Sequence, residues 1–206
     1  MAQTQPLDLK EKFILDACCG PKYMWFDKKN PNTLYIDIRR EKKGYFDYRK
    51  NQEVEPDMIA DFRNLPFEDK TFKLVVWDPP HLKSNKMEAG IIKTFGCLHP
   101  ETWQDDLKKG FKECWRVLDD YGLLVFKFCN SQIKFKKVME LFTEKPIFGN
   151  TSSTKKGSTK WFFFMKIPEK QGENFYPTKQ ESLICVKRVS AETPNLLTQT
   201  SLNANI

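Results

Sequence analysis

Four short apolar segments in the first half of the chain each end in an aspartate, and this recurrence constrains the fold most. Buried runs that stop abruptly are typical of strands in a parallel sheet. The carboxyl ends of such strands meet at one edge, where open α/β sheets bind their ligands. The sequence therefore predicts an α/β fold with acids gathered at that edge. The segments are residues 13–16, 34–37, 58–61 and 73–78, and they end at Asp16, Asp37, Asp61 and Asp78.

The fourth segment continues into Asp78-Pro79-Pro80-His81. A strand cannot continue through two residues that lack an N–H, so the prolines end it and stiffen the backbone that follows. An acid, two fixed carbonyl acceptors and a planar ring can together hold an exocyclic amine on a flat ring. An ordinary turn at the end of a strand explains Asp-Pro-Pro on its own equally well.

Over roughly residues 12–166 the chain resembles the class I methyltransferases that use S-adenosylmethionine (SAM). The order of the four acids carries the resemblance. Its most specific part is the segment 61–76, which is similar to that family's adenine-side loop and the strand after it. The resemblance implies a Rossmann-like, doubly wound and mostly parallel seven-stranded sheet with an antiparallel C-terminal hairpin strand.

The same resemblance implies SAM as the cofactor. Asp37 would accept from its ribose hydroxyls and Asp61 from its adenine amine, with Phe62 beside the adenine ring. Asp16 and Gly20 would shape the methionine end. The full set of implied cofactor-binding residues is Asp16, Ala17, Cys18, Gly20, Asp37, Ile38, Asp61, Phe62 and Asp78.

The Asp-Pro-Pro-aromatic pattern resembles amino-methyltransferases that act on nucleic-acid bases, and the chain is also similar to small methyltransferases of phages and prophages. His81 stands where those enzymes have Tyr, Phe or Trp, and the loop after the first segment has one glycine, Gly20, where three are usual. The resemblance implies methyl transfer to an exocyclic amine of the N6-adenine type. Asp78, Pro79 and Pro80 would hold that amine, and His81 would pack on the base.

Lysines lie near this motif and in a later loop. The net charge of +7 favours polyanionic partners. With His81, we expect Lys83, Lys155 and Lys156 to bind the substrate through contacts to the phosphates of DNA or RNA. Unpaired strands are favoured, because a base inside a duplex must first be flipped out. Solvated loop lysines are the alternative.

Two other functions stay open. Lys127 lies within an apolar segment, and RNA ribose methyltransferases place a lysine at a similar strand position. This keeps an RNA ribose hydroxyl or a small molecule open as the acceptor, although a lysine reaching solvent from a strand end explains it as well. The chain could also bind SAM without transferring its methyl group. A nicotinamide-dependent enzyme is disfavoured, because the first loop lacks the G-x-G-x-x-G spacing.

Hydrophobic spacing predicts the remaining elements. They are a helix over 103–118, a turn at 119–122, a strand over 123–128, helical spacing over 133–142, and a buried strand at 161–165 paired with 147–148. The long connection 82–100 is predicted to contact the substrate, with a plain surface excursion as the alternative. We expect an extension at 1–11, the methyltransferase domain at 12–168 and a tail at 169–206.

Composition argues against several classes. No apolar run has the length of a membrane span, and residues 1–12 have no apolar core of the signal-peptide type, so we expect a cytoplasmic protein. The six cysteines do not suggest a disulfide framework. Cys97 and His99 have no second pair at zinc-site spacing, so no metal is expected.

Overall fold

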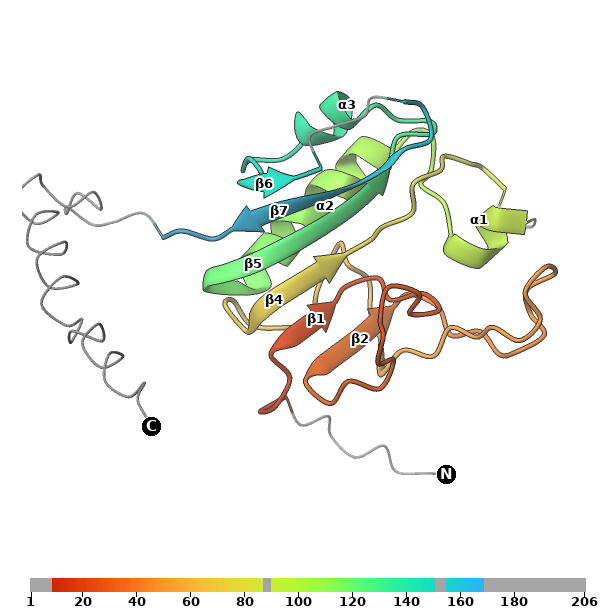
Figure 1. Ribbon diagram of the computed structural model, residues 1–206, viewed down its shortest axis with the longest axis horizontal. Helices are drawn as coiled ribbons and strands as arrows, with labels where there is room; N and C mark the ends of the chain where they lie inside the picture. Colours follow the sequence, from red (N-terminus) through yellow and green to blue (C-terminus); the bar gives the residue numbers. More distant parts are fainter. Residues whose placement is uncertain (1–8, 87–89, 151–154, 169–206) are drawn as a thin grey trace, which may run out of the picture. The chain divides into compact units, whose positions relative to one another are not determined.

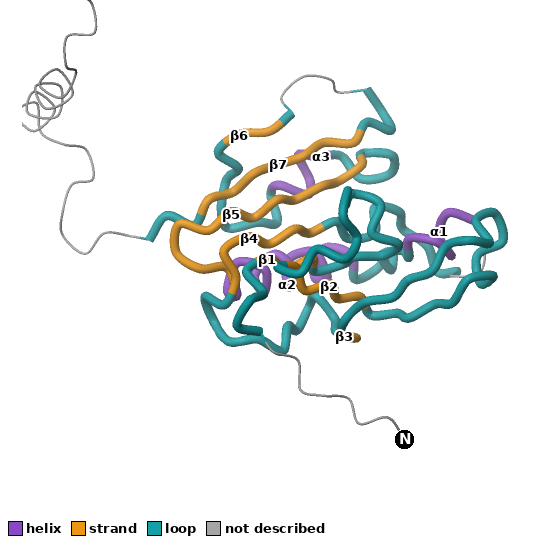
Figure 2. The backbone as a smooth tube through the Cα atoms, turned by 60° about the horizontal axis from the view of Figure 1, so that its bottom comes forward, coloured by secondary structure: helices purple, strands orange, loops and turns teal. Residues whose placement is uncertain are grey.

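The computed structural model describes residues 9–86, 90–150 and 155–168. A seven-stranded sheet runs through this part in the order β3-β2-β1-β4-β5-β7-β6 (Figure 1; β3 is labelled in Figure 2). Parallel strands come first, and antiparallel strands follow at one edge, which confirms the predicted Rossmann-like architecture. The predicted tail at 169–206 lies outside the described residues, as do residues 1–8 of the extension.

Each apolar segment that precedes an aspartate forms a strand. The strands are β1 (Ile14–Asp16), β2 (Thr33–Asp37), β3 (Met58–Ile59) and β4 (Phe72–Trp77). β1 pairs in parallel with both β2 and β4, which places Asp16 opposite Tyr35 and Val76. β2 is buried along its whole length, with the apolar run Leu34–Ile36 between Thr33 and Asp37. The acids therefore meet at the carboxyl edge of the sheet.

The antiparallel part is built on β5 (Leu118–Cys129) and β7 (Thr159–Met165). Their ladder brings Lys127 opposite Trp161. β6 (Phe148–Gly149) pairs with β7, so the predicted hairpin partner of the last strand is confirmed.

Helix α2 (Trp103–Val117) packs against β4 and β5 on one face of the sheet (Figure 1). The fit is close at Gly110, where a Cβ would lie 2.5 Å from the ring of Trp77 and 2.6 Å from that of Phe62. Real Cβ atoms do not approach so closely, so glycine is required here. In the part of the chain that the structure describes, every helix is too short or too polar to cross a bilayer.

The connections after β1 and β2 differ from a doubly wound fold. Described residues 17–32 and 38–57 contain turns and no crossover helix. In the first of them, Gly20-Pro21 and the Asn30-Pro31-Asn32 run interrupt helical backbone. The second of these loops lies beside the short helix α1 (Gly90–Phe95), where Arg39 donates to the carbonyl of Lys93 and Lys93 pairs with Asp47 (Figure 2).

Two predicted elements have different bounds. Helix α3 (Phe135–Met139) is shorter than 133–142, since the amides of Leu141 and Phe142 bond three residues back in a tighter turn. The turn expected at 119–122 is instead a bulge inside β5, where Phe72 pairs with Leu118 and Leu74 with Leu123.

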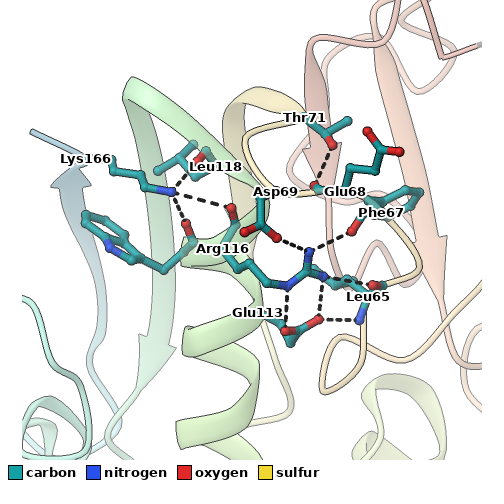
Figure 3. A network of polar contacts seen from close by, with 10 residues as sticks. Leu65, Phe67, Glu68, Asp69, Thr71, Glu113, Arg116, Leu118 and Lys166 are labelled. Atoms are coloured by element: carbon teal, nitrogen blue, oxygen red, sulfur yellow. Dashed lines mark hydrogen bonds and ion pairs between the residues drawn. The ribbon is translucent and has the colours of Figure 1, made fainter. Parts of the chain in front are cut away.

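A network of charges closes the opposite, amino-terminal edge of the sheet (Figure 3). The guanidinium of Arg116 donates to the carbonyls of Leu65 and Phe67 and to the carboxylates of Asp69 and Glu113. Lys166 donates to the carbonyls of Trp115 and Leu118 at 2.8 and 2.7 Å, and it reaches that of Arg116 at 3.5 Å. These bonds fix the loop after β3, the end of α2 and the start of β5 to one another.

Candidate active site

A cavity of about 230 Å³ lies at the carboxyl edge, between the strand ends and the segment that follows α1. Seven of the predicted site residues line it: Ala17, Cys18, Asp37, Ile38, Asp61, Phe62 and Pro80. Phe95, Gly96, Cys97 and Leu98, which also line it, belong to the connection 82–100 that was predicted to contact the substrate. Sequence reasoning did not assign the remaining lining residues, which are Arg39, Ala60, Arg63 and Asp106.

Asp37 ends β2 and is only 2% exposed. Its Oδ2 accepts from the amide of Gly20 at 2.9 Å, and its Oδ1 accepts from the amide of Arg39 at 2.9 Å. A carboxylate offers roughly four acceptor sites, so both oxygens keep capacity for further donors from the cavity. Gly20 is not a lining residue; it acts through Asp37, and its φ of +48° suits glycine.

Arg39 connects this acid to the segment that covers the cavity. Its guanidinium lies 3.4 Å from Oδ1 of Asp37 and donates to the carbonyls of Lys93 and Thr94 in α1, at 3.0 and 3.2 Å. The predicted substrate loop, residues 82–100, is thus bonded through Arg39 to Asp37, a predicted cofactor-binding residue. Phe95 and the residues after it form part of the cavity wall.

Asp61 and Arg63 form the other end of the cavity. The guanidinium of Arg63 contacts both oxygens of Asp61, the closest at 2.6 Å, and reaches Asp106 of α2 at 2.9 Å. Burial alone would raise the pKa of Asp61, but the hydrogen bonds and charge of Arg63 outweigh it and hold that pKa below its ordinary value. Asp61 therefore stays a charged acceptor, held in place by Arg63.

Asp16 lies deeper, at the end of β1, and is fully buried outside the cavity lining. Its Oδ2 accepts from the indole N–H of Trp25 at 2.6 Å and its Oδ1 from the amide of Cys18 at 3.2 Å. Burial raises the pKa of Asp16 to about 7, against the lowering effect of these bonds, with help from the charges of Asp78 and Asp37. Through these bonds Asp16 holds the loop that follows β1.

Asp78 follows β4 and is in contact with two basic side chains. The Nζ of Lys127 lies 2.5 Å from its Oδ2, and the Nε2 of His81 lies 2.8 Å from its Oδ1. The second approach is close but does not have hydrogen-bond geometry, so both atoms lack a hydrogen-bond partner in the described residues. The imidazole packs edge-on against Phe128, with ring centroids 4.9 Å apart.

The two prolines place the motif beside the cavity. Pro80 lines it, and a Cβ at Gly96 would lie 3.3 Å from the Cγ of Pro80. Pro79 is buried, and no donor within the described part of the chain bonds to its carbonyl. The motif therefore combines a free carbonyl acceptor with a partly satisfied carboxylate.

The predicted substrate lysines separate in the structure. Lys83 and Lys156 line a second hollow beyond the motif, whereas Lys155 is exposed outside its lining. Arg39 and Arg63 follow the strand-ending acids by two residues, which is a signal that sequence reasoning could have used. Asp106 carries no such signal, because it reaches the cavity only through the packing of α2.

No protein family and no curated protein sequence matches the chain. Among solved structures, a SAM-dependent methyltransferase from Methanosarcina mazei is 13% identical, with 76% of this chain and 92% of that one covered and a TM-score of 0.45. A Pyrococcus horikoshii protein is 18% identical (75% and 81% covered, TM-score 0.43). A SAM-dependent methyltransferase from Aquifex aeolicus is 14% identical (78% and 85% covered, TM-score 0.40). Similarity at this level leaves the function to the geometry of the site.

Proposed function

We propose that the protein is a SAM-dependent methyltransferase that acts on an exocyclic amine of a nucleic-acid base. One observation carries the proposal: the cavity lined by Asp37, Asp61 and Phe62 also reaches Pro80 of the Asp-Pro-Pro-His motif. Residues suited to an adenosine and residues suited to an acceptor amine are thus parts of one continuous surface.

The residues in the cavity fit the cofactor chemically. The carboxylates of Asp37 and Asp61 can accept from a ribose diol and an adenine amine, and Phe62 and Phe95 offer apolar surface to a flat ring. Ala17 is small and leaves room beside the first loop. When bound, SAM supplies a methyl group on a sulfonium, so the leaving group needs no acid and alignment dominates the reaction.

Two hydrogen-bond acceptors at the motif favour an amine. The Oδ1 of Asp78 and the carbonyl of Pro79 receive no hydrogen bond from the described residues, and an NH₂ group has two N–H donors for them. These bonds would draw the nitrogen lone pair out of conjugation and stabilise the positive charge that develops on it. Oδ1 is covered by His81, so the imidazole has to turn before the amine can reach this atom.

The contact between Lys127 and Asp78 favours a second candidate, a hydroxyl acceptor such as an RNA ribose. A lysine amine 2.5 Å from the carboxylate is placed to assist deprotonation of a hydroxyl brought to the motif. With an amine acceptor, the same lysine only fixes Oδ2 of Asp78 and balances its charge.

Transfer of a labelled methyl group tests both candidates. The protein is incubated with methyl-labelled SAM and unpaired DNA or RNA, and the modified nucleoside is identified by mass after digestion. We expect label on the base and retained activity in Lys127→Met. Label on the ribose together with an inactive but folded Lys127→Met would establish the hydroxyl candidate. SAM binding without label in any nucleic-acid fraction would contradict both.

A further inference from the structure

A second hollow lies next to the catalytic motif and has no part in the cofactor site. It has a volume of about 870 Å³ and lies among the end of β5, helix α3 and the turn before β7. Those elements appear in the upper part of Figure 1. Four lysines line it: Lys83, Lys134, Lys136 and Lys156. No acidic residue is among the described residues that form its lining.

The positive charge of this hollow is largely uncompensated. Lys83, Lys134 and Lys156 form no ion pair with a carboxylate in the described part of the chain. Lys136 lies 3.9 Å from Glu140, but both side chains are exposed, and such pairs contribute little. The Nζ of Lys83 lies over the ring of Trp103, 5.7 Å from its centroid, a contact that leaves its charge unneutralised. Four lysines from three separate segments thus line one space, and this arrangement attracts an anion with several charges.

The hollow is joined directly to the Asp-Pro-Pro-His motif. The side-chain carbonyl of Gln132 accepts from the amide of Lys83 at 2.7 Å, two residues beyond His81. The amide of Asn130 donates to the carbonyl of Ser158 at 3.0 Å, which ties the end of β5 to the turn that carries Lys156. A ligand in the hollow therefore lies at a fixed position relative to the acceptor site.

One aromatic side chain lies in this otherwise polar lining. Phe135 is partly exposed and rests edge-on against Phe162, with ring centroids 5.6 Å apart. The Nζ of Lys160 lies over its ring, 5.1 Å from the centroid. An anchored aromatic ring among lysines is the arrangement with which proteins bind unpaired bases and the phosphates between them.

We propose that this hollow binds the strand that flanks the target nucleotide, as single-stranded nucleic acid. Its lysines contact successive phosphates, and Phe135 stacks on a base beside the one presented to Asp78. This inference rests on the proposed function for the class of acceptor. It adds where the strand lies and why an oligonucleotide is preferred to a free nucleoside.

Binding of a labelled oligonucleotide tests this site. A single-stranded DNA and an RNA of about 12 nucleotides are titrated by fluorescence anisotropy over a range of salt concentrations. The test variant is Lys134→Gln/Lys156→Gln, and the control is Lys108→Gln/Lys112→Gln, which removes two exposed lysines from α2. SAM affinity by calorimetry reports that each variant is folded.

We expect the test variant to bind the oligonucleotide roughly tenfold more weakly and to lower the salt slope by about 1.4, since each lost phosphate contact on a single strand contributes about 0.7. The control should bind like wild type. Equal binding by the test variant and the wild type would overturn the site. Displacement of the labelled oligonucleotide by polyglutamate as effectively as by unlabelled single strand would also overturn it, because that would indicate a general anion-binding surface. A duplex bound as tightly as the single strand would also contradict it.

The length of the acceptor separates this inference from the proposed function. In the wild type we expect the KM for methyl transfer to fall at least tenfold from a trinucleotide to the longer oligonucleotide. Methyl transfer with the same KM for both lengths would overturn the strand site and leave the methyltransferase proposal intact. Absence of methyl transfer to any acceptor, with oligonucleotide binding weakened only in the test variant, would overturn the methyltransferase proposal and leave the strand site intact.

Discussion

The two edges of the sheet use the same kinds of side chain in different ways. At the amino-terminal edge, Arg116 and Lys166 are surrounded by carbonyls and carboxylates, and their donors are matched by acceptors. At the carboxyl edge, Asp16 is fully buried with no cation against it, and Oδ1 of Asp78 lacks a hydrogen-bond donor within the described residues. The cations of the first edge are matched by acceptors and hold the fold, although the buried hydroxyl of Thr33 at the start of β2 has no partner in the described residues. The second edge leaves Oδ1 of Asp78 and Nε2 of His81 without hydrogen bonds beside a cavity.

The comparison teaches how a carboxylate can be recognised as functional. Asp119 and Asp78 each face a lysine from a neighbouring strand, Lys73 in one case and Lys127 in the other. In the first pair Lys73 is 66% exposed and Asp119 26%, so the contact is open to solvent and its loss should matter little. The Asp78 pair is mostly enclosed beside a cavity, where the same chemistry can serve a reaction.

Asp78→Asn should have the largest effect. It removes the charge that favours a developing cation on the acceptor nitrogen, and loss of a comparable transition-state contact costs about 10²–10³ in rate. We expect kcat to fall by that factor with little change in SAM affinity, measured by steady-state kinetics and calorimetry. Asp119→Asn, the matched change at the opposite edge, should leave kcat within about twofold of wild type. Equal losses in both variants would mean that Asp78 has only a structural role.

Arg116→Met should have the next largest effect, and on stability alone. It leaves the carbonyls of Leu65 and Phe67 without their donor, and the carboxylate of Glu113 with only the amide of Leu65, which should lower the free energy of unfolding by about 2–3 kcal/mol. Urea denaturation measures the loss, and SAM affinity should change little. Arg39→Met provides the contrast. Here the loss in the free energy of SAM binding should exceed the loss in the free energy of unfolding, because Arg39 lines the cavity and bonds to α1. The opposite pattern would remove the distinction between the edges.

Asp37→Ala should weaken SAM binding by roughly tenfold, since the contact of a carboxylate with two hydroxyls contributes about 1.5–3 kcal/mol. Asp57→Ala is the control. Asp57 also supports β2, through the amide of Tyr35, but lies outside the cavity lining. Calorimetric titration with SAM should separate the two variants, and unchanged affinity in Asp37→Ala would remove the ribose assignment.

Much of the fold, and the site residues that directly follow the parallel strands, could be predicted from the sequence. Apolar runs ending in acids fix the parallel strands, and the prolines after Asp78 fix where β4 stops. Contacts over long distances in the chain could not be predicted. Arg39 reaches α1 54 residues away, and Arg63 reaches Asp106 43 residues away. No local pattern predicts such pairs, because they depend on how the loops fold over the sheet.

The hollow beside the motif shows the same limit. Lys83 and Lys156 were expected to bind substrate, but Lys134 and Lys136 were not, because nothing in a helical spacing pattern tells which face of α3 would lie near the motif. Only the packing of α3 beside the end of β5 brings the four lysines together. Lys83, next to the motif, and Lys156, in a polar loop rich in lysine, were therefore identified, whereas the lysines of α3 were missed because only its packing brings them near the motif.

The smallest expected effect is a difference in the pH dependence of stability between the edges. Hydrogen bonds from Arg116 hold the pKa of Glu113 below its ordinary value, so this contribution is complete above that value and is lost as the pH falls through the lowered pKa. Burial raises the pKa of Asp16 to about 7, so the folded state binds the extra proton and stability falls as the pH rises from about 4 to 7.

Urea midpoints measured across this pH range can separate the two contributions. Relative to wild type, Asp16→Asn should gain stability as the pH rises from about 4 to 7, by at most about 1.4 kcal/mol per pH unit for one proton. Glu113→Gln should instead lose less stability than wild type on acidification below about pH 4.5. If both differences had the same sign, folding would lower the pKa of Asp16 as it lowers that of Glu113. Asp16 would then be a stabilised ion like the acids of the amino-terminal edge, and the contrast between the two edges would fail.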